Sequence, residues 1–145
     1  MKLSSRLVAL PLAAALASAG LVAATATPAA AALPQCTKGA WLTAPNGLTL
    51  YLPATSTNST SCFLAEGSVS SAVKALQTAL KTCHGQNIAI DSDFGPATKQ
   101  ALKNVQSAMH IGVDGVYGTE TRNNIQFVIS EPNTIGPCRW GGWPR

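Results

Sequence analysis

The chain has 145 residues, 46% of them hydrophobic, and a formal net charge of +4. Two of its ten basic residues lie within the first six positions, so the segment after residue 32 carries eight basic and six acidic residues, a net charge of +2. A charge this small, without a cluster of basic side chains, excludes nucleic acid as a partner.

The first 32 residues have the pattern of a secretory signal peptide. Lys2 and Arg6 precede an apolar run over residues 7–24, which small residues follow. Cleavage sites of the A-x-A type end at Ala26 and Ala32, and we prefer the second because the polar chain begins soon after it. A retained membrane anchor needs about 20 continuous apolar residues, and prolines interrupt this segment. We therefore expect a secreted protein, extracellular or associated with the cell wall, with no membrane contact after cleavage.

All four cysteines lie in the exported part, at Cys36, Cys62, Cys83 and Cys138. An even number of cysteines in a small exported domain indicates disulfides, and four cysteines allow three pairings. We favour Cys36–Cys62, which ties an N-terminal extension to itself, and Cys83–Cys138, which holds the C-terminal tail on the body of the domain. The close C-x-x-C spacing of a cysteine metal site is missing, so we expect no metal site.

Residues 33–66 form an extension rich in Thr, Ser and Pro. Within it, Asn46-Gly47 separates residues 41–43 from a segment over 48–52 in which leucines alternate with Thr and Tyr. Asn-Gly is a strong signal for a two-residue hairpin turn. We expect a short β-hairpin followed by a Ser/Thr-rich loop over 54–61.

Helical periodicity begins at Ser68, after Gly67, and three amphipathic helices are expected. The first has its apolar face at Val69, Val73, Leu76 and Leu80. The second begins at Pro96, because the fixed φ of proline suits a first helical turn, and its apolar face is Thr98, Ala101, Leu102, Val105 and Met109. The third runs from about Thr119 to Ile129, with Thr121, Ile125 and Val128 facing inward.

The expected fold class is mainly α. It is a compact three-helix bundle with a duplicated turn–helix motif, preceded by a short β-hairpin extension and carrying two disulfides. The expected organisation is a signal peptide at 1–32, the extension at 33–66, the helical domain at 67–131 and a C-terminal tail at 132–145.

A turn motif occurs twice, once before the second expected helix and once before the third. The copies match at Asp91/Asp114, Phe94/Tyr117, Gly95/Gly118 and Thr98/Thr121. The aspartate can accept backbone N–H bonds in a turn, and the aromatic ring can fill the end of the bundle. The glycine permits backbone conformations closed to other residues. Each position therefore has a structural use.

The doubled turn resembles the peptidoglycan-binding-domain family, a three-helix module often appended to wall hydrolases. The resemblance is also carried by Val73–Gln77, Val105-Gln106 and the segment over 111–118. The resemblance covers about residues 67–129. The chain departs from the family pattern at Ser92, where glycine is usual, at Val105, where an aromatic residue is common, and at Thr119, where proline is frequent. The resemblance implies that the exported chain binds peptidoglycan or muropeptides.

By resemblance, the ligand-binding surface lies near the second and third helices and the turn between them. This surface would hold Asp114, Tyr117, Thr119, Arg122 and Asn123. Arg122 could bind a stem-peptide carboxylate through two hydrogen bonds, or it could be an ordinary solvated helix residue, and Tyr117 could instead belong to the core.

Trp140 and Trp143 of the tail are further candidates, because indole faces stack well on sugars. Alternatively, one of the two indoles folds back to cover the bundle.

Catalysis is not expected. Only His84 and His110 could serve as histidine ligands of a zinc ion, whose catalytic sites need three protein ligands. Cys83 is better explained by a disulfide than as a nucleophile, and the acidic residues Asp91, Asp93 and Glu120 by turns and a helix start. We therefore expect no enzyme activity and no cofactor.

Two functions remain in competition. The first is a secreted, non-catalytic peptidoglycan-binding module. The second is a secreted protein–protein interaction protein of the same fold, with a wall hydrolase as a partner that it regulates.

Overall fold

The computed structural model describes residues 32–131 and 134–144, and the following account concerns this part of the chain. The expected signal peptide lies outside the described residues, apart from Ala32. None of the helices in the described part is long and apolar enough to cross a membrane.

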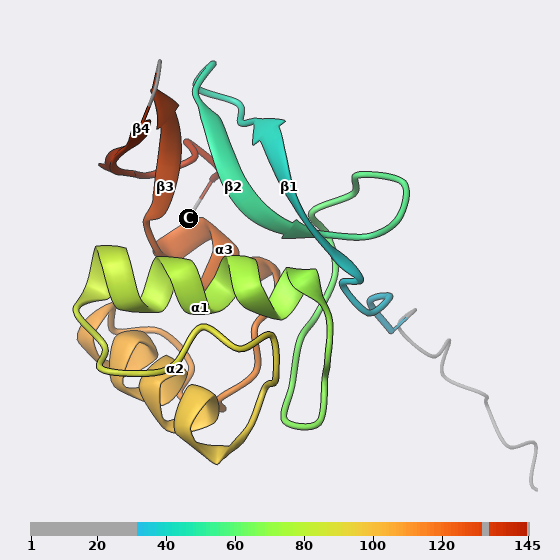
Figure 1. The fold of residues 1–145 in the computed structure, drawn as a ribbon, viewed down its shortest axis with the longest axis vertical. Helices are drawn as coiled ribbons and strands as arrows, with labels where there is room; N and C mark the ends of the chain where they lie inside the picture. The colour runs from blue at the N-terminus through green and yellow to red at the C-terminus, as the bar shows by residue number, and fades with distance from the viewer. Residues whose placement is uncertain (1–31, 132–133, 145) are drawn as a thin grey trace, which may run out of the picture. The chain divides into compact units, whose positions relative to one another are not determined.

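Four strands and three helices follow one another along the described chain. In order they are β1 (Lys38–Thr43), β2 (Thr49–Ala54), α1 (Ser71–His84), α2 (Pro96–Ala108), α3 (Thr119–Asn124), β3 (Phe127–Glu131) and β4 (Thr134–Arg139). The strands form one antiparallel sheet in the order β1-β2-β3-β4. Figure 1 shows α1 between this sheet and α2, and α1 contacts all four strands as well as α2.

The expected mainly α three-helix bundle is wrong, because a four-stranded sheet packs on the helices. The expected third helix continues to Ile129, but α3 ends at Asn124 and the chain then becomes β3. Phe127, Val128 and Ile129 are aromatic and β-branched residues, which fit a pleated and buried surface well. They meet the hairpin there, where Ile129 pairs with Leu50. The periodicity of Ile125 and Val128 suits a helix equally well, so tertiary pairing decides the structure.

The segment beyond Pro132 also contributes to the sheet. Strand β4 contains Pro137, and its Val128–Cys138 pairing places it beside β3. Proline lacks the N–H that an inner strand needs, but β4 is the last strand of the sheet, where proline is tolerated.

The hairpin of β1 and β2 is present, but its turn differs from the expected one. Ala44 N–H donates to Leu48 O, and Gly47 N–H donates to Ala44 O, so three residues connect the strands. Gly47 has φ +84°, whereas Asn46 does not have a positive φ. This is the three-residue connection that ends in a left-handed residue. Pro45 favours it, because proline suits the second position of a type I turn.

Helix α1 begins at Ser71, three residues later than expected, and Val69 is 72% exposed. The residues before it lie against the first turn instead: Phe94 N–H donates to Ser68 O, and Ser70 N–H donates to Ser92 O. Leu64 forms a similar bridge with Tyr117 in the second turn. The segment from 64 to 70 therefore connects the two copies of the motif.

Two buried glutamines organise the doubled turn, one for each copy. Gln77 of α1 donates from Nε2 to Asp91 Oδ1 at 2.7 Å, and its Oε1 accepts from the N–H groups of Asp91 and Ser92. The hydrogen bond from Gln77, followed by that from the N–H of Asp93, holds the pKa of Asp91 below its ordinary value.

Gln106 of α2 repeats this arrangement in the second turn. It donates to Asp114 Oδ1 at 2.8 Å and to Thr121 Oγ1, and it accepts from the N–H of Gly115. Both glutamine side chains are at most 1% exposed, as expected of internal hydrogen-bonding residues. The repeat in the sequence thus corresponds to a repeated structure, in which a buried glutamine side chain closes each turn through hydrogen bonds.

One core joins the sheet to the helices. Phe94 and Tyr117, the aromatic residues of the two turns, are completely buried. Their buried neighbours from the strands and helices include Leu50, Leu52, Leu76, Leu80, Leu102, Ile125 and Phe127.

Two disulfides close the chain on itself. Cys36 bonds to Cys62 and Cys83 bonds to Cys138, which is the pairing favoured above. The second disulfide joins the last turn of α1 to β4 and so fixes the start of the C-terminal segment.

Candidate ligand-binding site

Arg122 is a buried cation on the short helix α3. Its backbone N–H donates to Gly118 O in the first turn of this helix. The residue is only 6% exposed. Its Nε and Nη2 donate to Asn123 Oδ1 at 3.1 and 2.9 Å, and its Nη1 donates to Thr60 Oγ1 at 2.9 Å. All three bonds therefore go to neutral acceptors.

Among the side chains that the structure describes, which leave out residues 1–31, 131–135 and 145, no carboxylate neutralises Arg122. In this part of the chain the ion pair found joins Lys99 to Glu66, at 2.8 Å. Buried arginines are normally paired with an acid, because an uncompensated charge in a protein interior is costly. Burial lowers the pKa of Arg122, but arginine remains charged near neutral pH.

The indole of Trp143 covers the guanidinium. Its ring lies 4.8 Å from the Arg122 Cζ atom, a distance at which a cation and an aromatic face attract each other. The ring packs directly on Gly141, where a Cβ would lie 1.7 Å from Trp143 Cζ3. Only glycine therefore allows the chain to return over Arg122 in this way.

Two asparagines hold the C-terminal segment in place. Asn46 of the hairpin turn donates from Nδ2 to Trp140 O at 2.7 Å. Asn123 donates from Nδ2 to Pro144 O, next to the acceptor that it offers to Arg122. The hairpin, α3 and the segment after Cys138 thus meet around one cation.

A cavity of about 380 Å³ opens beside this cluster. It is lined by Leu42, Thr43, Ala44, Pro45, Leu52, Asn58, Thr60 and Trp143. Thr60 and Trp143 are the two lining residues that contact Arg122. Its volume falls within the range of small-ligand sites, and its walls combine aliphatic groups with a few hydroxyl and amide groups, as such sites do.

The structure brings together three of the residues expected to bind ligand, Arg122, Asn123 and Trp143. Tyr117 is instead a core residue, and burial raises its pKa. Its hydroxyl has no hydrogen-bond partner among the described residues.

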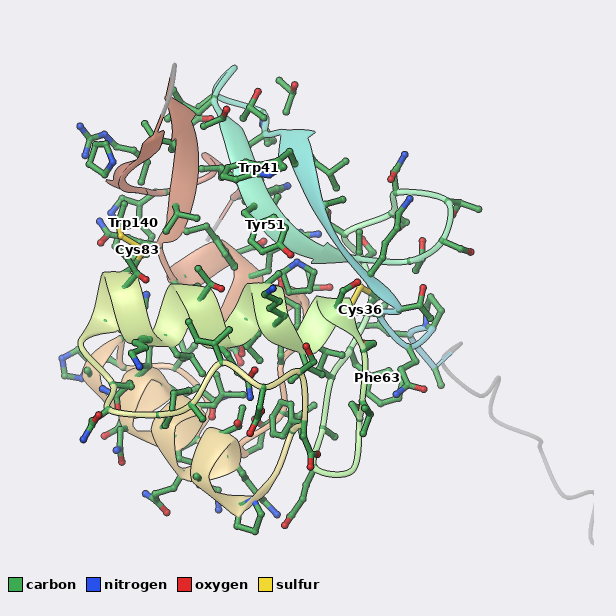
Figure 2. The ribbon with its side chains drawn as sticks, viewed as in Figure 1. Cys36, Trp41, Tyr51, Phe63, Cys83 and Trp140 are labelled. Atoms are coloured by element: carbon green, nitrogen blue, oxygen red, sulfur yellow. A yellow bond between two sulfur atoms is a disulfide. The ribbon has the colours of Figure 1, made fainter. Side chains whose placement is uncertain are left out.

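The other expected contacts are Asp114, Thr119 and Trp140, and their positions differ. Asp114 is exposed and holds the second turn through Gln106 and the N–H of Val116. Thr119 is the first residue of α3. Trp140 lies close to the disulfide of Cys83 (Figure 2), since it follows Cys138 by two residues.

The hairpin carries a second aromatic feature. Trp41 and Tyr51 are paired across β1 and β2, their ring centroids 5.2 Å apart, and Trp41 is 45% exposed. Figure 2 shows the two side chains together over the hairpin. An exposed aromatic pair of this kind can contact a sugar or a protein partner.

Most of the cavity wall was not anticipated from the sequence. The Asn-Gly signal indicated the hairpin that carries Leu42 and Ala44, but nothing in it places these residues beside α3. Asn58 and Thr60 belong to a Ser/Thr-rich loop without periodicity. Only the disulfide Cys36–Cys62 gave a hint, because it fixes the end of this loop to the chain just before β1.

Comparison with known proteins finds a family model that matches the helical part of the chain. Residues 69–125 match a family model described as "putative peptidoglycan binding domain". The chain is also 44% identical over 64 residues to the zinc D-Ala-D-Ala carboxypeptidase of Streptomyces albus G, a match that covers 43% of this chain and 25% of that protein. The chain thus spans about a quarter of this relative.

Similar solved structures carry related names. A fused zinc-dependent amidase/peptidase/peptidoglycan-binding-domain protein from Clostridium acetobutylicum is 34% identical, with a TM-score of 0.41 over 42% of this chain and 27% of that one. The SleB N-terminal domain is 31% identical, with a TM-score of 0.41 over 43% and 85% of the two chains. A peptidoglycan-binding protein from Clostridioides difficile is 36% identical, with a TM-score of 0.42 over 43% and 39%.

The cavity residues lie outside the matched segment, between residue 42 and residue 60 and at Trp143, whereas Arg122 lies within it. The resemblance expected from the doubled turn is confirmed: residues 69–125 match the peptidoglycan-binding-domain family.

Proposed function

We propose that the chain is a secreted, non-catalytic protein that binds peptidoglycan in the cell wall. The match of residues 69–125 to a peptidoglycan-binding-domain family carries this proposal. The two disulfides are consistent with an oxidising location outside the cytoplasm. The proposed ligand contacts are Arg122, Asn123 and Trp143, which form one cluster, while Asp114, Tyr117 and Thr119 act in the fold.

A binding role rather than a catalytic one is supported by what the reactive side chains do. Cys83 is in a disulfide, and the neighbouring His84 accepts a hydrogen bond from the Gln126 N–H at 3.0 Å through its Nε2. Asp91 is engaged by Gln77 and the N–H of Asp93. Cys83, His84 and Asp91 are thus each committed to a contact within the fold.

Co-sedimentation with purified sacculi tests the proposal. Residues 33–145 should be enriched in the pellet, also after secondary wall polymers have been stripped, and no soluble muropeptides should be released. Protein that stays in the supernatant would refute wall binding. Release of muropeptides would refute the non-catalytic role.

A second candidate function is the binding of a secreted protein such as a wall hydrolase. The pair of exposed Trp41 and half-buried Tyr51 favours it, because aromatic side chains are enriched in protein interfaces. Pull-down from culture supernatant distinguishes the two functions. A stoichiometric protein partner, together with no affinity for sacculi, would favour the second.

A further inference from the structure

The charge of Arg122 calls for a partner that the described part of the chain does not supply. Its side chain is buried, its hydrogen bonds go to an amide oxygen and a hydroxyl, and an indole covers its face. These contacts position the guanidinium without neutralising it. A bound anion would supply the missing opposite charge, and charge-assisted bonds to arginine are about twice as strong as neutral ones.

The form of the adjoining cavity limits what that anion can be. Leu42, Ala44, Pro45 and Leu52 give it an apolar wall, and Thr43, Asn58 and Thr60 supply hydrogen-bonding groups. A ligand that carries small apolar side chains and backbone amides, as a short peptide does, complements such a lining. A highly charged group such as a phosphate would meet one buried cation and a few neutral hydrogen-bonding groups, which leave most of its charge without a counter-ion.

We propose that this cavity binds the carboxylate end of a short peptide, with Arg122 as its counter-ion and Trp143 as a movable wall. The inference rests on the proposed function, and within peptidoglycan it selects the free carboxyl group of a stem peptide as the group recognised. The hairpin and the segment after Cys138 build the cavity, so the specificity lies in parts of the chain outside the family match.

Two features show how the carboxylate reaches Arg122. Asn123 Oδ1 already accepts from both Nε and Nη2, so it occupies the place that a carboxylate oxygen would take in a bidentate pair. Trp143 separates the guanidinium from the cavity and belongs to a short segment held by Asn46 and Asn123. A modest shift of the indole and of the Asn123 amide exposes the guanidinium edge to the cavity.

The decisive experiment compares two ligands on the unaltered protein. Residues 33–145 are titrated calorimetrically with a disaccharide–tetrapeptide muropeptide and with the same muropeptide after amidation of its peptide carboxyl groups. The acid form should bind at least about tenfold more tightly, as expected for loss of a hydrogen bond to a charged group. Equal affinity for the two ligands would overturn the proposal.

Variants then assign the effect to this site. Arg122→Gln should weaken binding of the acid form by about the same factor and leave the amidated form unchanged. Arg139→Gln is the matched control, since Arg139 is exposed and its substitution removes the same charge at another place on the protein. If both variants weaken binding equally, only long-range attraction is involved and the proposal fails.

Two further arms keep failure of the inference apart from failure to fold and from failure of the proposed function. Thr60→Val removes an acceptor of Arg122 and should also reduce the preference for the acid form, even if Arg122→Gln does not fold. Sacculus binding without a carboxylate preference would overturn this inference and leave wall binding intact. Loss of all sacculus binding would remove both.

Discussion

At the level of single residues, the two copies of the turn differ in backbone strain. Ser92 has φ +71° and Gly115, its counterpart, has φ +73°. This conformation is open to glycine and strained for other residues. The hydrogen bonds of Ser92 in the turn use its backbone N–H and C=O, so the side chain is not needed for them.

Ser92→Gly should therefore stabilise the protein by about 0.5–1 kcal/mol, because the relief of strain exceeds the greater freedom that glycine gives the unfolded chain. Urea unfolding of residues 33–145 measures this. Gly115→Ser is the reciprocal variant and should destabilise by about 1 kcal/mol or more, since its Cβ would also approach the Lys99 and Lys103 side chains. A less stable Ser92→Gly protein would contradict this account.

A second residue-level effect concerns pH. The Nε2 of His84 can accept the Gln126 N–H only when the ring is unprotonated there, and burial lowers the pKa of His84 below its ordinary value of 6.5. In the unfolded chain the ring takes up its proton near that ordinary value. The stabilisation is thus complete above pH 6.5 and is lost as the pH falls toward the lowered pKa.

The midpoint temperature of thermal unfolding should consequently decrease when the pH is lowered from 7.5 to 5. A His84→Gln variant, whose side chain does not titrate, should show a smaller fall over the same range. The carboxylate of Asp91 affects a lower range, because its pKa is lowered from an already acidic value. Identical pH profiles for the two proteins would rule out His84 as the cause.

The aspartates of the duplicated motif were readable from the sequence because Asp91 and Asp114 accept bonds from residues only two positions later. The expectation for the motif glycines was wrong: Gly95 and Gly118 have extended backbone with negative φ, which other residues also adopt. The burial of Arg122 was harder to predict from the sequence. Its helical position suggested exposure, whereas its burial depends on Thr60 and Trp143, which lie 62 residues before it and in the C-terminal segment.

At the level of elements, α1 is tied to the sheet by a covalent bond as well as by packing. The Cys83–Cys138 disulfide closes 55 residues of chain, from the end of α1 to β4. In the chain-entropy model a closed loop of this size contributes about 4 kcal/mol by restricting the unfolded chain.

Replacing both Cys83 and Cys138 with alanine should lower the free energy of unfolding by about 3–4 kcal/mol. Denaturant unfolding with tryptophan fluorescence measures this, because Trp140 lies beside the bond and reports on the release of β4. The Cys36–Cys62 pair spans 26 residues, so its removal should cost somewhat less. The reverse order would show that contacts in the folded state, rather than chain entropy, dominate.

The boundary between α3 and β3 shows why element types could only partly be predicted. Helix α2 begins at Pro96 as expected, since a proline fixes the first turn by itself. Beyond Asn124 the local signal is compatible with helix and strand alike. The pairing of Ile129 with Leu50, far away in sequence, selects the strand.

For the described molecule as a whole, the matched segment and its additions share one core. Leu50 and Leu52 of β2, with Phe127 of β3, are fully buried in the cluster that includes α1 residues. All three lie outside residues 69–125. Burial of each such side chain is worth about 1.5–3 kcal/mol, which is a large share of the usual 5–15 kcal/mol of stability.

A fragment of residues 67–126 should therefore lose cooperative unfolding, whereas residues 33–145 should unfold in one transition. Far-ultraviolet circular dichroism during heating tests this, with dispersion of amide resonances as an independent measure. A fragment as stable as the longer chain would show that the sheet is an accessory to an independent helical domain.

The Cys83–Cys138 bond has a further consequence for when the protein can act. It precedes Trp143 by five residues and anchors the segment that covers Arg122. While the two thiols are reduced, the segment that carries Trp143 lacks its covalent anchor, and the hydrogen bonds from Asn46 and Asn123 remain to hold it over Arg122. Under the proposed function, formation of this bond outside the cytoplasm would complete the cavity, so the oxidised protein alone would have the full binding site.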